Sequence, residues 1–285
     1  MDTSNCARRA WIAACVLATA ASWPVSLQAA EALYEPVIGQ EGKDVVWVPT
    51  PPVLIEKMLD MAGVTAKDFV MDLGSGDGRN VIAAAKRGAR ALGVEYNPDM
   101  VELSKRAAAK EGVAERALFV RGDMYEADIS KATVLALFLL TENLNKLVPK
   151  FLDMRPGSRI VVNGFEIDGW KADETARADG ECGSWCGAYL YIVPAKVAGA
   201  WSLGTGTLVI EQKFQEVSGT FISGGTTTPI RNTRLRGDEI RFAVGTVSYV
   251  GRVDGNTMRG EVKGATVAAW KAVRKPEKVA KSSDQ

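Results

Sequence analysis

The sequence predicts an α/β protein in which a doubly wound, mostly parallel sheet is followed by a small antiparallel β-barrel or sandwich. Apolar runs alternate with helical patterns over residues 45–167, which is typical of parallel strands joined by crossover helices. After about residue 194, helical periodicity ends and short alternating runs are separated by glycine turns, as in antiparallel β domains. A chain of 285 residues with 47% hydrophobic content is large enough for one or two domains.

These changes in pattern divide the chain into four parts. We expect a leader over residues 1–30, the α/β domain over 31–194, the antiparallel β domain over 195–275 and a tail over 276–285. The tail is expected to be disordered because it is charged and lacks aromatic residues.

The leader has the three regions of a signal peptide. Arg8 and Arg9 precede an uncharged, largely apolar stretch, and small residues follow near 29–32. Pro24 and Gln28 interrupt the apolar run, which favours cleavage over an uncleaved membrane anchor. The sequence therefore predicts export, with the periplasm as the destination and no stable membrane span after cleavage.

Each strand of the α/β part is expected at a short apolar run. The five runs are residues 69–73, 90–95, 117–123, 132–140 and 158–165. The fourth is apolar from 134 to 140, which suits a strand buried on both faces of a parallel sheet. Residues 189–195 either form the last strand of this sheet or belong to the junction with the β domain.

Helices are expected between the strands, bounded by caps and glycines. Thr50 is the expected N-cap of the first helix, which has Pro51 in its first turn and ends at Gly63. A second helix follows a glycine-rich stretch. A third begins after Asn97 and ends at Gly112.

Composition excludes several function classes. The chain has no histidine, which excludes histidine general bases, Ser-His-Asp triads and His-ligated zinc, and no metal site is expected. A formal net charge of +1 gives no electrostatic footprint for general nucleic-acid binding. Outside the leader the cysteines are Cys182 and Cys186, whose spacing favours a structural disulfide over a redox pair.

The stretch DLGSGDG is the strongest candidate for a binding site. Its glycines are Gly74, Gly76 and Gly78. They lie between a strand and a helix, where a ligand can approach the backbone and helix N–H groups point toward it. The spacing is not that of the dinucleotide fingerprint G-x-G-x-x-G, because Arg79 occupies the sixth position. Asp72 precedes the turn and suits a cationic ligand; accepting backbone N–H groups is its alternative role.

Two further acids are expected at neighbouring strand ends. Glu95 ends the second strand, where an acid can accept hydrogen bonds from two ribose hydroxyls. Asp123 ends the third and is expected to accept from an exocyclic adenine amine, with Met124 against the ring; a surface turn is the alternative. A ribose acceptor, an adenine acceptor and a negative site for an ammonium describe S-adenosylmethionine and not NAD.

On these residues, the segment 45–167 resembles a class I, seven-strand S-adenosylmethionine-dependent methyltransferase with a Rossmann-like sheet. The resemblance implies that the glycine turn contacts the methionine portion, with Asp72 near its amino group. It also implies that Glu95 holds the ribose and that Asp123 lies on the adenine side. The upstream segment VWVPTP is similar to one in a lysine methyltransferase group that modifies membrane-associated and other proteins, where it borders the cofactor and substrate pocket. Residues 195–285 lie outside the resemblance.

The part of the pocket that binds the methyl acceptor, which we call the acceptor side, is expected to be formed by two short segments. The candidate residues are Trp47, Pro49, Thr50, Thr141, Glu142 and Asn143. Trp47 also fits core packing, and the three residues after the fourth strand also fit helix capping. Thr50 is in addition expected to reach the cofactor. The sequence has no N-P-P-Y motif after the fourth strand, which disfavours methylation of amide or base nitrogens.

The expected activity is methyl transfer from S-adenosylmethionine, with a protein lysine amine as the preferred acceptor and a small molecule as the alternative. A nucleic-acid partner is not expected. A competing hypothesis is an exported protein that binds an adenosyl ligand without methyl transfer and uses its β domain to bind a partner. A third hypothesis, ranked last, assigns the function to the β domain as a ligand-holding barrel.

Overall fold

The structure is a computed structural model that describes residues 34–180, 182–183, 185–263 and 269–276. The predicted signal peptide lies outside the described residues, as does nearly all of the predicted tail. Among the described residues, no helix combines the length and apolarity that crossing a membrane requires.

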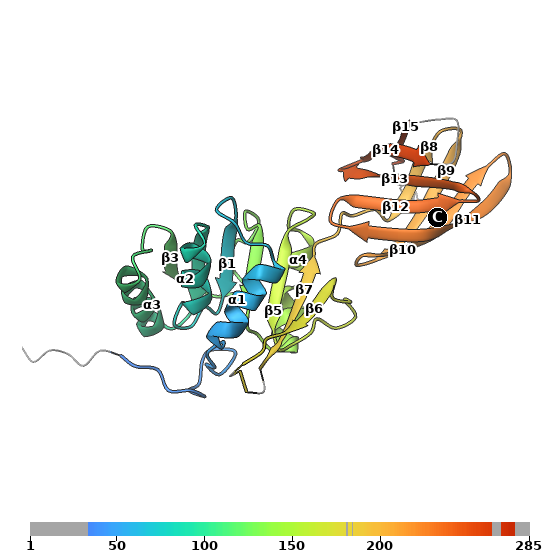
Figure 1. Cartoon of the computed structure of the whole chain (residues 1–285). Helices are drawn as coiled ribbons and strands as arrows, with labels where there is room; N and C mark the ends of the chain where they lie inside the picture. The colour runs from blue at the N-terminus through green and yellow to red at the C-terminus, as the bar shows by residue number, and fades with distance from the viewer. Residues whose placement is uncertain (1–33, 181, 184, 264–268, 277–285) are drawn as a thin grey trace, which may run out of the picture. The chain divides into compact units, whose positions relative to one another are not determined.

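Seven strands form one sheet in the order β3-β2-β1-β4-β5-β7-β6 (Figure 1). Their bounds are β1 Phe69–Leu73, β2 Arg90–Glu95, β3 Ala117–Arg121, β4 Val134–Leu137, β5 Arg159–Asn163, β6 Glu174–Arg177 and β7 Gly187–Ile192. The first five are parallel, and β7 is antiparallel to both β5 and β6. The chain reverses its direction of strand addition at β1 and β4, so the carboxyl ends of these strands border a crevice.

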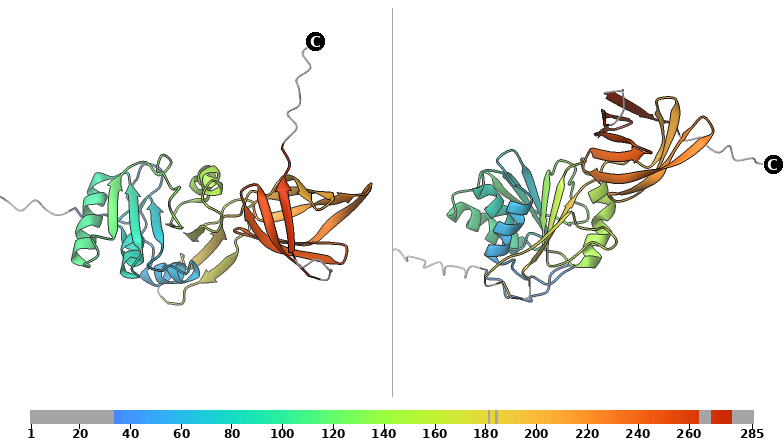
Figure 2. Two further views of the ribbon diagram at one scale, coloured as in Figure 1. Left: turned by 90° about the horizontal axis from the view of Figure 1, so that it is seen from above. Right: turned by 45° about the vertical axis from the view of Figure 1, so that its right-hand side comes forward.

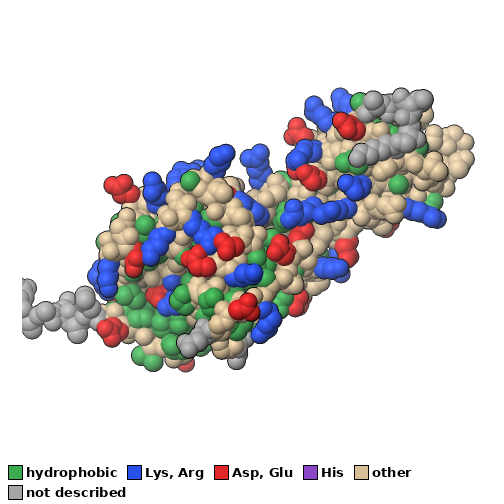
Figure 3. Space-filling model, viewed as in Figure 1, with side chains coloured by type: hydrophobic (Ala, Val, Ile, Leu, Met, Phe, Trp, Pro, Cys, Tyr) green, Lys and Arg blue, Asp and Glu red, His purple; other side chains and the backbone are tan. Residues whose placement is uncertain are grey.

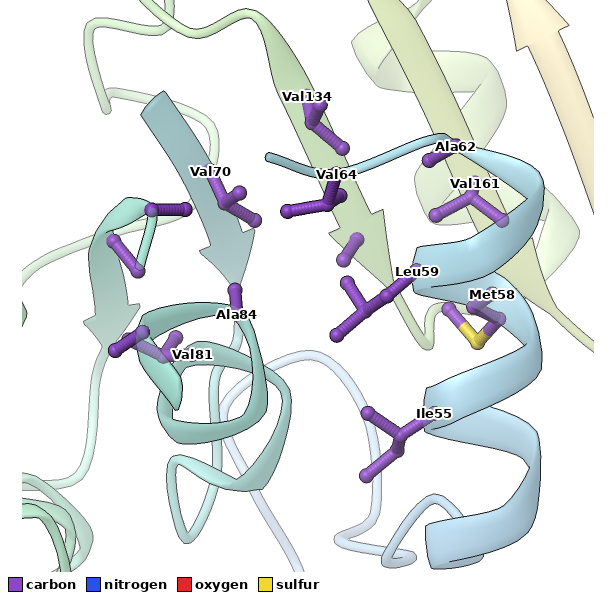
Figure 4. Close-up of a cluster of buried hydrophobic side chains, with 14 of the residues drawn as sticks. Ile55, Met58, Leu59, Ala62, Val64, Val70, Val81, Ala84, Val134 and Val161 are labelled. Carbon is purple, nitrogen blue, oxygen red and sulfur yellow. The ribbon is translucent and has the colours of Figure 1, made fainter. Parts of the chain in front are cut away.

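Helices cover both faces of this sheet. Their bounds are α1 Pro52–Met61, α2 Arg79–Lys86, α3 Pro98–Lys110 and α4 Thr141–Leu152. Apolar residues of α1, α2 and α3 are buried in one cluster, and those of α4 in a second cluster with other residues of β1 and β4. Figure 4 shows Ile55, Met58 and Leu59 of α1 in the same buried cluster as Val134 and Val161 of the sheet.

The five predicted strands are present. The fourth is shorter than the run expected at 132–140: β4 is buried throughout but ends at Leu137, and Leu140 is exposed. The prediction that Thr50 caps α1 is wrong. The helix begins one residue later, Pro51 occupies the cap position, and no side chain caps the helix. The Thr50 side chain accepts no hydrogen bond from the described first-turn N–H groups. Its hydroxyl oxygen instead lies 3.5 Å from Nδ2 of Asn163.

The second domain is a closed eight-stranded barrel in the order β10-β11-β12-β13-β14-β15-β8-β9 (Figure 2). Its strands are β8 Gly199–Leu203, β9 Gly206–Lys213, β10 Glu216–Ser223, β11 Thr226–Arg236, β12 Glu239–Val244, β13 Val247–Asp254, β14 Thr257–Lys263 and β15 Ala269–Arg274. Trp201, Phe242 and Met258 are fully buried in its core, so its own side chains occupy the interior. Because β10 pairs with β9, the described strands of the barrel leave no unpaired sheet edge.

The sheet ends at Ile192 and the barrel begins at Gly199, on either side of the boundary expected at 194/195. Aromatic stacking joins the two domains: the buried Trp170 ring lies 4.9 Å from the Phe214 ring, with 8° between their planes. Beside it, the backbone N–H of Ala195 donates to the Gly237 carbonyl at 2.8 Å.

Candidate active site

A hollow of about 870 Å³, including open solvent, lies at the carboxyl ends of β1 and β2. We call it the strand-end hollow. Its lining comes from residues 40–50, the glycine turn before α2, the segment after β2, the segment after β3 and Phe138 after β4. Segments far apart in the sequence thus meet at the edge where open α/β sheets bind ligands.

The glycine turn is held in a conformation that only glycine adopts without strain. Gly74, Gly76 and Gly78 have φ angles of +74°, +56° and +81°. The N–H groups of Gly74 and Ser75 both donate to the Val94 carbonyl, at 2.8 and 3.1 Å, which ties the turn to β2. A Cβ on Gly78 would lie 2.7 Å from the Phe119 ring, so a side chain there has no room.

Glu95 is fixed by the same turn. Its Oε2 accepts a hydrogen bond from the N–H of Gly76 at 2.9 Å, and its Oε1 accepts from the N–H of Asn97 at 2.9 Å. Asn97 in turn caps α3 by accepting from the N–H of Asp99. Each carboxylate oxygen of Glu95 retains acceptor capacity for a hydroxyl in the hollow.

Asp72 is a buried carboxyl group beside the hollow, with only 3% of its surface exposed. Burial raises its pKa to about 8, and the nearby charges of Glu95 and Asp77 add to this, whereas a hydrogen bond from Asn80 opposes it. No Lys or Arg in the described part of the chain forms an ion pair with Asp72. The Oδ1 of the buried Asn80 side chain has no hydrogen-bond partner among the described residues.

Asp123 and Met124 both line the hollow, as the adenine-side prediction requires. Asp123 is not free, however: Lys43 donates to its Oδ2, and the N–H of Tyr125 donates to its Oδ1 at 2.8 Å. The hydrogen bond from Lys43 is the main cause of the lowered pKa of Asp123. The role of Asp123 in binding adenine stays a prediction.

The segment before α1 supplies residues of the hollow that sequence reasoning missed. Lys43 pairs with Asp123 and lies 5.0 Å from the ring of Tyr96. Arg79, the first residue of α2, donates to the Thr50 carbonyl at 2.9 Å and ties the segment to the glycine turn. Lys43 and Asp123 are 80 positions apart, and no local pattern relates them.

The predicted acceptor-side residues separate into two groups. Trp47, Pro49 and Thr50 line the hollow, and a Cβ on Gly76 would lie 2.7 Å from the indole nitrogen of Trp47. Thr141, Glu142 and Asn143 form the first turn of α4 and are not among the lining residues. Nor do they cap it, because Leu140 occupies the cap position and no side-chain cap hydrogen bond is present. The Asn143 side chain instead donates to the Tyr125 hydroxyl at 2.8 Å.

The residues of the hollow fit S-adenosylmethionine. The buried, unpaired Asp72 and the unpartnered oxygen of Asn80 suit the methionine ammonium, because a cation there stabilises the carboxylate that burial disfavours. Glu95 offers acceptors for the two ribose hydroxyls, and the glycine turn leaves room for close approach to the backbone. Together with the strand order, these features define an S-adenosylmethionine-dependent methyltransferase.

Comparisons with known proteins agree. Residues 72–174 match the family model described as the ANTKMT methyltransferase domain. A protein-lysine N-methyltransferase of Saccharolobus islandicus is 41% identical over 153 residues, which cover 52% of this chain and 94% of that protein. An adenine nucleotide translocase lysine N-methyltransferase of Mus musculus is 34% identical over 104 residues, 36% of this chain and 45% of that protein.

The chain therefore belongs to the protein-lysine N-methyltransferase family. It is an enzyme that uses S-adenosylmethionine as its cofactor, so the competing hypothesis of a binding protein without methyl transfer is not supported. Among solved structures, an RNA methyltransferase from Salinibacter ruber in complex with S-adenosylhomocysteine is 39% identical; the match covers 53% of this chain and 96% of that one, with a TM-score of 0.49.

Proposed function

We propose that this enzyme methylates the Nε amine of lysine side chains in a protein acceptor. The observation that carries the proposal is the 41% identity to a protein-lysine N-methyltransferase over nearly that protein's whole length. On the face shown in Figure 3, acidic and basic side chains are interspersed, which suits a protein acceptor better than a polyanionic nucleic acid.

The cofactor supplies a methyl group activated by a sulfonium. In the transfer a nitrogen–carbon bond forms as the sulfur–carbon bond breaks, and the amine loses a proton to solvent. The chain's own residues bind and orient: Asp72 and Glu95 position the ligand, and the segment bearing Trp47 shields it from water. A lysine must be neutral to attack, and apolar surroundings lower its pKa. None of these roles needs a histidine.

The direct test is incubation of the purified chain with methyl-labelled S-adenosylmethionine and a panel of lysine-containing proteins, followed by mass spectrometry of the products. We expect label on lysine Nε atoms and a strong decrease with the Glu95→Ala variant. Label on another residue type, or no transfer from a chain that binds the cofactor, would contradict the proposal.

We further propose that the enzyme is exported to the periplasm by its leader. The support is the arginine pair, apolar stretch and small-residue zone of residues 1–32. Fractionation of cells that express the full chain, with N-terminal sequencing, tests this: a periplasmic product that begins near residue 30 is expected, and a cytoplasmic product that retains Met1 would exclude export.

A further inference from the structure

Three aromatic side chains from separate segments meet beside the strand-end hollow. Phe138 follows β4, Phe165 follows β5 and Trp185 precedes β7. Ring centroids are 6.2 Å apart for Phe138 and Phe165, 5.6 Å for Phe138 and Trp185, and 5.3 Å for Phe165 and Trp185. All three are only partly buried, so each ring keeps an accessible surface. We call this group the aromatic wall.

Phe138 joins the wall to the hollow, whereas Phe165 and Trp185 lie behind it and are not among the residues that line the hollow. Phe138 itself lines the hollow. Trp185 covers Gly164, the residue after β5, where an added Cβ would lie 3.1 Å from the indole. The neighbouring Asn163 reaches Thr50, which lines the hollow from the opposite segment. The wall is therefore contiguous with the hollow at the carboxyl ends of β4 and β5, away from Glu95 and the ribose side.

Trp185 lies next to a disulfide. Cys182 and Cys186 are bonded and buried, with Cα atoms 5.2 Å apart, and Trp185 lies inside the small loop that they close. The N–H of Trp185 also donates to the Cys182 carbonyl at 3.1 Å. Phe165 packs against the core cluster of α4, whereas Trp185 belongs to none of the buried clusters in the described part of the chain. Trp185 is thus held by the loop that the disulfide closes together with its contacts to Phe138 and Phe165.

We propose that the aromatic wall binds the side chain of the acceptor lysine, both as the ammonium and in its methylated forms, with the disulfide holding Trp185 in place. The inference rests on the proposed function. Aromatic faces attract ammonium and quaternary ammonium groups through their negative π surface and also pack against an aliphatic stem. Tryptophan is the strongest of these faces, and methylation makes the cation less hydrated and easier to desolvate against it.

Equilibrium binding tests the proposal without activity as the readout. The full chain, saturated with S-adenosylhomocysteine, is titrated by NMR with Nε-trimethyl-lysine amide and with norleucine amide, whose side chain carries no charge. We expect the cationic ligand to bind about tenfold more tightly than norleucine amide. Trp185→Ala should lose most of that preference and Trp185→Phe should retain part of it, with unchanged affinity for S-adenosylhomocysteine in both. Equal binding of the two ligands, or equal preference in wild type and Trp185→Ala, would overturn the inference.

Reduction of the disulfide provides an independent test of the proposal. Dithiothreitol should weaken binding of Nε-trimethyl-lysine amide to the wild type about as much as Trp185→Ala does. The Cys182→Ser, Cys186→Ser double variant should start from the weaker value and not respond to the reductant. Undiminished binding after confirmed reduction would remove the role of the disulfide. If the chain methylates no lysine but still prefers Nε-trimethyl-lysine amide, the proposed function is contradicted. The inference that the aromatic wall binds ammonium groups would still hold.

Discussion

Asp72 is the residue on which the electrostatics of the site depend most. The fold places its carboxyl group at the end of β1, almost fully buried, with Asn80 as its side-chain hydrogen-bond donor. Burial raises its pKa to about 8, so the group is mostly protonated at neutral pH when no cation is present. An ammonium in the hollow would favour the ionised form.

The raised pKa predicts how stability depends on pH. Between pH 4 and pH 8 the folded protein retains a proton on Asp72 that the unfolded chain releases, so this group makes the free energy of unfolding fall as pH rises. Asp72→Asn cannot ionise and removes that contribution. In urea denaturation at pH 5 and pH 8, the wild type should lose stability relative to Asp72→Asn at the higher pH. Parallel behaviour of the two proteins would show that Asp72 titrates normally.

At the scale of elements, the glycine turn joins β1 to α2 and contacts two other parts of the fold. Gly78 is surrounded by Phe119 and Ser104, whereas Gly112, after α3, has a similar positive φ of +70° with nothing near a Cβ position. Alanine substitutions at these two glycines therefore separate the free-energy cost of a left-handed backbone conformation from that of steric overlap.

Gly112→Ala should therefore reduce the free energy of unfolding by roughly 1–2 kcal/mol, the penalty of a left-handed conformation alone. Gly78→Ala should reduce it by about 3–5 kcal/mol, because overlap with Phe119 and Ser104 adds a packing cost. Chemical denaturation measures both. A similar decrease in the free energy of unfolding for the two variants would mean that a Cβ at Gly78 adds no steric cost.

The sequence predicts those elements that have a clear apolar pattern or a clear cap. The five parallel strands and α3 have uninterrupted apolar runs or a clear cap at Asn97, and the structure contains them. The edge strand β6 was not foreseen, because its residues are mostly exposed and have no apolar alternation. The α1 cap was predicted wrongly because two consecutive prolines at 51–52 shift the helix start by one residue.

Part of the site could be predicted from the sequence because some of its residues belong to local patterns. Asp72, the glycines and Glu95 are predictable because they lie at fixed distances from a strand end. The pairing of Lys43 with Asp123 and the meeting of Phe138, Phe165 and Trp185 depend on packing between distant segments. No spacing rule connects such residues, so only the folded chain reveals them.

In the whole molecule, the hollow and the barrel are built from separate stretches of sequence. Among the described residues, those that line the hollow lie between Gln40 and Phe138. The barrel has its own core, and its contacts with the first domain include the stacking of Phe214 on Trp170. The barrel is thus a separate domain, and none of its described residues lines the hollow.

A chain that ends at Pro194 should bind S-adenosylhomocysteine within about threefold of the full chain. Its thermal stability should fall, because Trp170 loses the stacked Phe214 ring, retains only the edge contact with Tyr191 and becomes more exposed. Calorimetry and circular dichroism measure both properties. Lost binding by a truncated chain with intact secondary structure would show that the barrel supports the hollow directly.

We expect the backbone amides of the glycine turn and the acids at neighbouring strand ends to hold the cofactor together. Calorimetric titration of Glu95→Gln with S-adenosylhomocysteine tests it most directly, with Glu102→Gln on the exposed surface of α3 as the matched control. Removing a charged acceptor should weaken binding by roughly 10- to 100-fold, and the control should match the wild type. Wild-type affinity in Glu95→Gln would contradict the account.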